Sequence, residues 1–145
     1  DMLNWAWNDG CVIVGHNIAY DLTIVNTNLA RHGLGTLTIT GPVLDTFVVD
    51  KHVDKWRKGK RTLTAMSEHY NVVLDDAHNA DADAKAAVLI AAAIAEAKLG
   101  RYSPDYLHTK QVDWAAEQAA SLQEYFRRTR PDAVVDGTWP VRSAA

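Results

Sequence analysis

The stretch Cys11-Val12-Ile13-Val14-Gly15-His16-Asn17-Ile18-Ala19-Tyr20-Asp21 decides the fold of this chain. Its first five residues form a short apolar run, which is typical of a strand covered on both faces. His16 and Asn17 follow at the carboxyl end of that strand. In open α/β sheets, ligands usually bind at this end, where a strand gives way to a helix. The stretch therefore predicts an α/β fold with a site near residue 16.

The segments that follow predict a pair of parallel strands. A helix is expected from the end of the first strand to about His32, because Gly33 and Gly35 end it. Residues 37–39 suggest a brief strand, and residues 43–49 are a clearer one, since they are apolar and rich in β-branched side chains. Strand, helix and strand in succession indicate a parallel pair.

The rest of the chain is predicted to be mainly helical. Thr62 is expected to cap a helix that reaches about Tyr70. An alanine-rich helix begins near Asn79 and closes at Gly100. The sequence Ser103-Pro104-Asp105 combines a cap, a proline at the first position and an acid in the first turn, so a long helix starts there and ends near residue 128. An extended tail follows.

Composition places the chain among globular proteins of one domain. It has 145 residues, 48% of them hydrophobic, and a formal net charge of −3. This charge gives no global attraction for nucleic acid, so binding to a polyanion requires a local basic cluster or a metal. The lone Cys11 is expected to be a buried, inert thiol. No apolar run approaches the length of a membrane span, which favours a cytoplasmic enzyme.

Two aspartates lie on the apolar stripes of predicted helices. A carboxylate there is costly unless a cation meets it. On a helix starting near residue 79, Asp83 shares its face with Ala80, Ala87, Ile90 and Ile94, whereas Asp81 points toward Lys85. The same spacing puts Asp21 beside Ile24, Val25 and Leu29. Two inward carboxylates on two helices predict a divalent metal site.

The same residues carry a family resemblance. Gly15-His16-Asn17-x-x-Tyr20-Asp21 and His78-x-Ala80-x-x-Asp83 resemble the second and third motifs of the DnaQ-like (DEDDh) 3′–5′ exonucleases, a family that includes the proofreading epsilon subunit of bacterial DNA polymerase III. Residues 42–46 resemble the strand between those motifs. The resemblance runs from about residue 3 to about residue 99. It implies a ribonuclease H-like α/β fold, with an exonuclease domain over residues 1–100 and a C-terminal helix and tail over 101–145 that pack on the same domain.

The first motif of that family is absent from this sequence. It is an Asp-x-Glu on an N-terminal strand that supplies two of four acidic ligands, and no Asp-x-Glu occurs here. We therefore expect an N-terminally incomplete exonuclease, weak or inactive alone, whose missing acidic pair comes from an N-terminal segment or a companion chain. The alternative is a catalytically inactive nucleic-acid-binding or polymerase-docking module.

The resemblance also implies roles for individual residues. Asp21 and Asp83 would hold a two-ion site of Mg²⁺ or Mn²⁺, and His78 would be the general base that takes a proton from the attacking water. His16 and Asn17 would face the substrate, although Asn17 is equally well explained as a turn-forming residue. Asp45 would support the site from behind the ligands, a role compatible with accepting hydrogen bonds from neighbouring backbone amides.

A basic segment between residues 51 and 61 is the candidate nucleic-acid contact. Lys55, Arg57, Lys58, Lys60 and Arg61 surround Trp56, whose ring offers a stacking face for an unpaired base. We name Trp56, Lys58 and Lys60 as substrate-binding residues, while a simply solvated loop is the alternative.

The sequence thus favours an exonuclease that acts on single-stranded 3′ ends, with DNA preferred over RNA, releases nucleoside monophosphates, and has a DNA polymerase as a candidate partner. The aromatic residues of the last helix, Trp114, Tyr125 and Phe126, are expected to be packing anchors and not platforms for bases. If they are exposed, they would suggest a protein partner.

Overall fold

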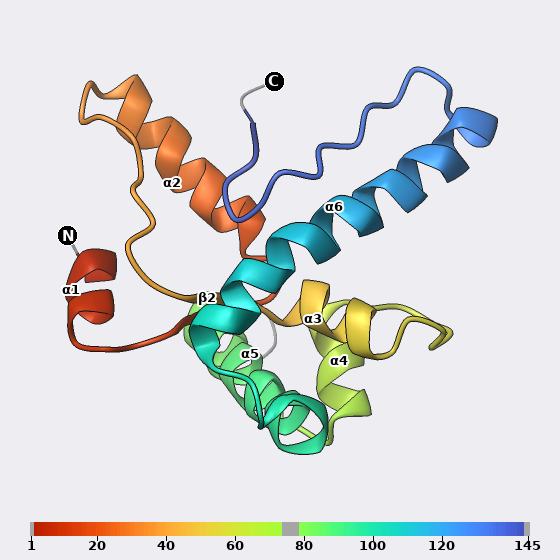
Figure 1. The fold of residues 1–145 in the computed structure, drawn as a ribbon, viewed down its shortest axis with the longest axis horizontal. Coiled ribbons are helices and arrows are strands. Elements are labelled where there is room, and N and C mark those ends of the chain that lie inside the picture. The colour runs from red at the N-terminus through yellow and green to blue at the C-terminus, as the bar shows by residue number, and fades with distance from the viewer. Residues whose placement is uncertain (1, 74–78, 144–145) are drawn as a thin grey trace.

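A computed structural model describes residues 2–73 and 79–143 of the chain. Along the sequence (Figure 1) it contains α1 (Met2–Asn8), β1 (Ile13–Gly15), α2 (Ala19–Arg31), β2 (Val43–Asp45), α3 (Thr46–Val53), α4 (Leu63–His69), α5 (Ala80–Ile94), which continues as a π-helical turn, η1 (Ala95–Leu99), and α6 (Pro104–Thr129). The expected α/β class is confirmed. None of the described helices is both long and apolar enough to cross a membrane.

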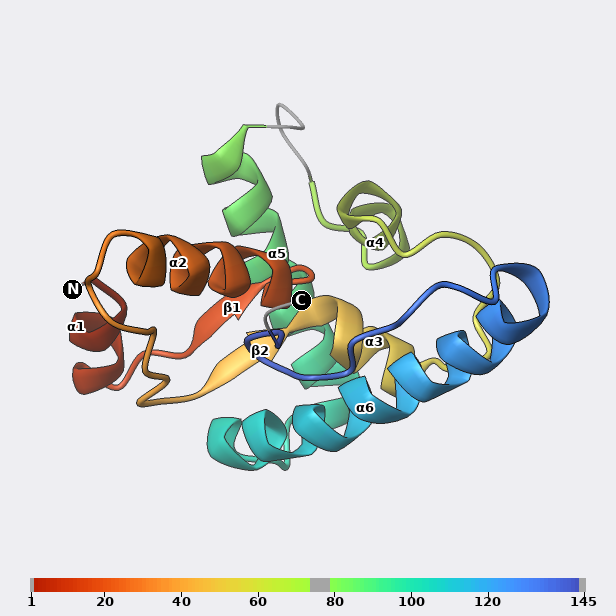
Figure 2. The same ribbon diagram turned by 90° about the horizontal axis from the view of Figure 1, so that it is seen from above.

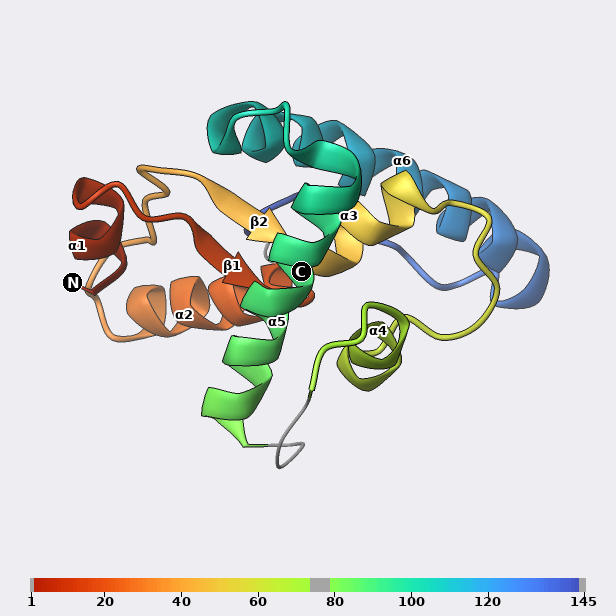
Figure 3. The ribbon, with the colours of Figure 1, turned by 90° about the horizontal axis from the view of Figure 1, so that it is seen from below.

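The sheet consists of the predicted parallel pair. Ile13 lies opposite Val43 and Gly15 opposite Asp45. Because successive side chains of a strand point to opposite faces, Val43 packs with α2 in one buried cluster, and Leu44 packs against a second cluster that includes Ile90 and Ile94 of α5. Figure 3 shows α5 passing across β1. Helices therefore cover both faces of this small sheet, and the functional end of β1 lies between α2 and α5.

The second strand is shorter than expected, and this is a correction. Residues 43–49 were predicted to be one strand, but only 43–45 are, and the chain turns into α3 at Thr46. The cause is a helix cap: the carboxylate of Asp45 accepts a hydrogen bond from the backbone N–H of Phe47 at 3.0 Å. Val48 and Val49 are still buried, as residues of a helix.

Two smaller expectations are also wrong. Residues 37–39 form no strand, because the backbone N–H of Leu37 is bound instead by the Asn26 side chain of α2, at 2.8 Å. Cys11 is exposed and not buried, since β1 begins only at Ile13.

The predicted helix ends are confirmed by their caps. Gly33 follows α2 with a φ of +68°, a conformation that glycine adopts without strain. The side chains of Thr62, Asn79 and Ser103 accept hydrogen bonds from the first turns of α4, α5 and α6. Local sequence signals therefore set most of the helix boundaries.

Side chains of α6 close the outer edge of β2. The backbone N–H of Asp45 donates to Oε1 of Gln111 at 2.7 Å, and Nε2 of Gln111 donates to the carbonyl of Val43 at 3.0 Å. The N–H of Val43 donates to Nδ1 of His108 at 3.1 Å. Figure 2 shows α6 running beside β2. These side chains thus take the hydrogen-bonding place of a further strand.

The C-terminal tail returns along α6 to the start of α2, as Figure 1 shows. Gln123 binds the backbone of Ala133 and Val135, each at 2.8 Å. Trp139 is buried, and the N–H of Arg142 donates to the Thr23 hydroxyl at 2.9 Å. The tail therefore ends beside the helix that follows β1.

We predict that Gln111→Leu lowers the free energy of unfolding by roughly 2–4 kcal/mol, because leucine fills the space but leaves the Asp45 N–H and the Val43 carbonyl buried without partners. Denaturant unfolding measures the change. The exposed Thr109→Leu on the same helix is the control, with an expected change within about 0.5 kcal/mol. Equal effects of the two substitutions would contradict a role for Gln111 at the strand edge.

Candidate functional site

A cavity of about 530 Å³ opens at the carboxyl end of β1. Its walls come from β1 and the turn after it, α2, the first residue of α4 and the first two turns of α5. They are lined by Val14, Gly15, His16, Ile18, Asp21, Leu63, Ala80, Asp83, Ala84 and Ala87. Asp21 and Asp83, about sixty residues apart in the sequence, thus line one cavity.

Asp83 lies where the helical spacing places it. It is half-buried, and Ala87, Ile90 and Ile94 on the same face of α5 are buried in the core, whereas Ala80, which was expected on that face, is exposed. Asp81, on the other side of the helix, is exposed. The apolar stripe of α5 therefore faces the core and aims Asp83 at the cavity.

Asp21 reaches the cavity differently from what was expected. The predicted inward stripe of α2 is wrong, because Ile24 and Val25 are 43% and 40% exposed and Asp21 is itself exposed. The buried face of α2 consists of Ala19 and Leu22, which pack with Val43 of β2. Packing against the sheet thus sets the rotation of the helix, and Asp21 lies at the rim of the cavity.

His16 lines the cavity, but its ring nitrogens are occupied by the protein. Nδ1 lies 2.9 Å from the Thr46 hydroxyl, and Nε2 lies 2.9 Å from the backbone carbonyl of Arg61. In the neutral ring, Nε2–H donates to that carbonyl and Nδ1 accepts from Thr46. Burial lowers the pKa of His16, and the nearby Asp45 partly opposes this. A contact from substrate to a ring nitrogen would have to break one of these bonds.

Asn17 and Asp45 together fix the turn after β1. Asn17 has a φ of +57°, which asparagine tolerates better than most residues. Its N–H donates to Oδ1 of Asp45 at 2.8 Å, and its side-chain oxygen accepts from Arg142 at 3.4 Å. Asp45 is 1% exposed, and burial raises its pKa, while the hydrogen bonds that it accepts from the N–H groups of Asn17 and Phe47 and from Trp139 oppose this rise. Its contacts match those expected of an acceptor for neighbouring backbone amides.

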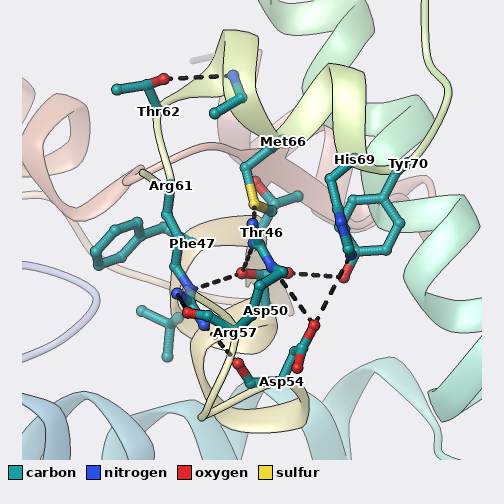
Figure 4. A network of polar contacts seen from close by, with 12 residues as sticks. Thr46, Phe47, Asp50, Asp54, Arg57, Arg61, Thr62, Met66, His69 and Tyr70 are labelled. Atoms are coloured by element: carbon teal, nitrogen blue, oxygen red, sulfur yellow. Dashed lines mark hydrogen bonds and ion pairs between the residues drawn. The ribbon is translucent and has the colours of Figure 1, made fainter. Parts of the chain in front are cut away.

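The basic residues around Trp56 do not form one surface, which corrects the expectation of a single basic cluster, because the two arginines are bound to a buried carboxylate (Figure 4). Oδ2 of the fully buried Asp50 binds Arg57 at 2.5 Å and Nε of Arg61 at 2.8 Å, while its Oδ1 accepts from the Tyr70 hydroxyl at 2.7 Å. These two arginines therefore join α3 to the loop and to α4 instead of facing solvent. Of residues 55–61, Trp56, Lys55, Lys58 and Lys60 have exposed side chains, whereas Arg57 and Arg61 are half-buried.

One predicted site residue lies outside the described part of the chain: His78, the candidate general base. Over residues 2–73 and 79–143, no group of three or more His, Cys, Asp or Glu side chains is close enough to hold a metal ion. Among the described residues, the carboxylates that could bind a metal ion at the cavity are thus Asp21 and Asp83.

Sequence reasoning missed the residues that hold the site in place. Thr46 binds His16 and Gln111 binds the strand edge, and neither role was expected. A signal was present for Gln111, because it is a polar residue on the inward stripe of α6 between Leu107 and Trp114. A buried polar side chain at such a position needs a partner.

Comparisons with known proteins agree with this geometry. The model of the family described as "Exonuclease" matches residues 4–91, which include every residue that lines the cavity. The chain is 36% identical over 78 residues to a DNA polymerase III PolC-type of Lacticaseibacillus paracasei, covering 54% of this chain and 5% of that protein. It is 26% identical over 127 residues to the protein of that name from Pediococcus pentosaceus, covering 88% of this chain and 8% of that protein.

The chain therefore spans less than a tenth of the length of these relatives. No solved structure matches it significantly.

We predict that the protein loses stability as the pH falls below about 6.5, the ordinary pKa of histidine, partly through His16. Because the folded pKa is below the unfolded one, the unfolded chain binds more protons in this range, and acid favours unfolding. Chemical denaturation at pH 8, 6.5 and 5.5 measures the effect. His16→Gln should be less stable at pH 8 but lose less on acidification.

His52, whose pKa burial also lowers, is present in both proteins, so their difference isolates His16. The exposed His32→Gln is the control and should keep the wild-type slope. Parallel pH profiles for wild type and His16→Gln would contradict the assignment.

Proposed function

Because the chain belongs to the DnaQ-like exonuclease family, whose model matches residues 4–91, we propose that it is a metal-dependent 3′–5′ exonuclease that releases nucleoside monophosphates from single-stranded 3′ ends, DNA before RNA. The observation that carries the proposal is the placement of Asp21 and Asp83, from two helices, in one cavity at the carboxyl end of β1. The fold proposed with it is ribonuclease H-like, with residues 1–100 as the exonuclease part and 101–145 packed on it. The parallel pair and the helices on both faces support this fold.

The two aspartates fit a divalent ion in part. Carboxylate oxygens are the donors that Mg²⁺ and Mn²⁺ prefer, and both side chains reach the cavity. Two carboxylates on different helices can contribute to one ion, whereas a two-ion site needs more. When bound, such an ion activates water and offsets the charge that develops on the scissile phosphate.

The chain's own residues would divide the remaining work. Asp21 and Asp83 would hold the ion, and His78 would accept the proton of the attacking water. His16, held by Thr46, would form part of the cavity wall beside the substrate. Asn17, which does not line this cavity, would fix the turn next to it through its hydrogen bond to Asp45. Trp56, Lys58 and Lys60, which are exposed, would contact bases and phosphates of the incoming strand.

The name of the relatives supports a setting in replication. They are called DNA polymerase III PolC-type, so we propose that the chain acts on DNA in association with a DNA polymerase. Removal of misincorporated nucleotides from the 3′ end would be its task there.

A second candidate is a module that binds nucleic acid or a polymerase without hydrolysis. The observation that favours it is the number of acidic donors. The sequence holds no Asp-x-Glu, and the described part of the chain brings only two carboxylates to the cavity. Weak turnover is expected for the same reason, so the assay below uses protein in excess over substrate.

We predict slow, Mn²⁺-dependent shortening of a 5′-labelled single-stranded DNA that is lost in Asp21→Asn and Asp83→Asn, because each removes one of the two cavity carboxylates. Gel electrophoresis measures the products. Asp81→Asn is the matched control, since this exposed aspartate lies on the same helix turn as Asp83. Equal shortening by Asp83→Asn and wild type would refute the site, and no shortening at all would favour the module.

Removal of nucleotides from the 3′ end gives a ladder from a 5′ label and mononucleotide at once from a 3′ label. Removal from the 5′ end gives the reverse, and internal cleavage gives fragments of several lengths from both labels. An RNA oligonucleotide of the same sequence tests the sugar preference. Faster loss of RNA than of DNA would contradict the proposed substrate.

We also predict that His78→Ala lowers the turnover rate by ~10²–10⁴, the usual contribution of a general base, and leaves oligonucleotide affinity unchanged. Single-turnover kinetics between pH 6 and 9 measure it. The exposed His32→Ala serves as the control. A full turnover rate in His78→Ala at every pH would show that another group takes the proton.

A further inference from the structure

A second large cavity lies between α3 and α6, on residues that the first cavity does not use. It has a volume of about 460 Å³, within the range of small-ligand sites. Its walls include Lys51, Lys55 and Trp56 from α3 and the following loop, and Trp114, Glu117 and Tyr125 from α6. Figure 1 shows these two helices beside each other. We call this cavity the α3–α6 groove.

Aromatic rings from two different elements border the groove. Trp56 is 85% exposed and Tyr125 is 60% exposed, although large aromatic side chains are usually buried. Trp114 is half-buried, and His52 stacks on its ring at 3.8 Å and 12°. Trp56 and Tyr125 thus offer ring surface to a planar ligand, while Trp114 belongs to the wall. The expectation that Tyr125 is a packing anchor is wrong.

Cations accompany these rings. Nζ of Lys55 lies 5.4 Å from the centre of the Trp56 ring, and Nζ of Lys51 lies 5.4 Å from that of Phe47. Lys51 is half-buried, so its ammonium has lost part of its hydration and gains more from an anion than a solvated lysine would. Glu117 is the carboxylate among the lining residues, and it can accept a hydrogen bond from an amino group. The groove therefore suits a ligand with flat rings, amino groups and negative charge.

We propose that the α3–α6 groove binds a stretch of unpaired nucleic acid, with bases on Trp56 and Tyr125 and phosphates against Lys51 and Lys55. The groove shares no lining residue with the cleavage cavity, and of the residues that the proposed function assigns to the substrate strand it contains Trp56 alone, so the proposal extends that function to a second surface. Stacking accepts any base, so binding would tolerate sequence. An apolar peptide is the rival occupant, but two lysines beside exposed rings favour a polyanion.

The test is fluorescence anisotropy of a labelled oligothymidylate, with the full chain carrying Asp83→Asn and with EDTA present, so that no cleavage occurs. Trp56→Ala and Tyr125→Ala should each weaken binding by roughly 5- to 150-fold, the range that one lost base stack gives. Lys55→Ala should reduce the slope of log affinity against log salt by ~0.7. The controls are Trp5→Ala on α1, an exposed tryptophan far along the chain, and Lys98→Ala, an exposed lysine of η1.

Control-like affinities for the Trp56 and Tyr125 variants would overturn the proposal, as would absence of binding in EDTA. A third result would also overturn it: an apolar helical peptide displaces the oligonucleotide, both variants bind this peptide more weakly than the wild type does, and the affinity for the peptide does not depend on salt. The proposed function can fail separately. If the chain never shortens DNA but binds it through Trp56 and Tyr125, the proposal for the groove stands and the exonuclease proposal is wrong.

Discussion

The buried carboxylate of Asp45 is the interaction on which the rest of the structure depends. It accepts the N–H of Asn17 at the end of β1 and the N–H of Phe47 at the start of α3, while its own N–H is bound by Gln111 of α6. Burying a carboxylate is costly unless donors surround it. Asp45 thus fixes a turn and a helix start through its side chain and a strand edge through its backbone, so these three features depend on one residue.

The contacts of Asp45 also position the walls of the cavity that Asp21 and Asp83 line. The turn held by Asp45 leads directly into α2, and Asp21 lies in the first turn of that helix. Thr46, which follows Asp45 in the sequence, holds the ring of His16. The Arg61 carbonyl binds the other side of that ring, and the Arg61 side chain is bound to Asp50. The loop with Trp56, Lys58 and Lys60 is therefore tied through Arg61 to the wall of the carboxylate cavity. A change in that ion pair would move the exposed cations as well as the histidine.

Much of this fold could be predicted from the sequence, for identifiable physical reasons. Helix caps and glycine stops act locally, so Thr62, Asn79, Ser103 and Gly33 give the boundaries they indicate. Asp83 was placed correctly because Ile90 and Ile94 repeat on its face of α5. The strand over residues 43–49 was overestimated, because β-branched side chains favour a strand until a cap at Asp45 starts a helix. The rotation of α2 and the inward turn of Arg57 and Arg61 depend on partners distant in space, which no local pattern reveals. The role of His78 comes from resemblance alone.

The closure of the β2 edge has a consequence for self-association. Strands propagate between molecules when an open edge presents unpaired backbone groups to another chain. At β2 those groups are bound by Gln111 and His108 at fixed positions on a helix, so this side cannot template a neighbour. Within the described part of the chain, β1 carries no strand on its other side. Any added strand would therefore have to pair with β1, so a ribbon that grows at both edges of the sheet is prevented.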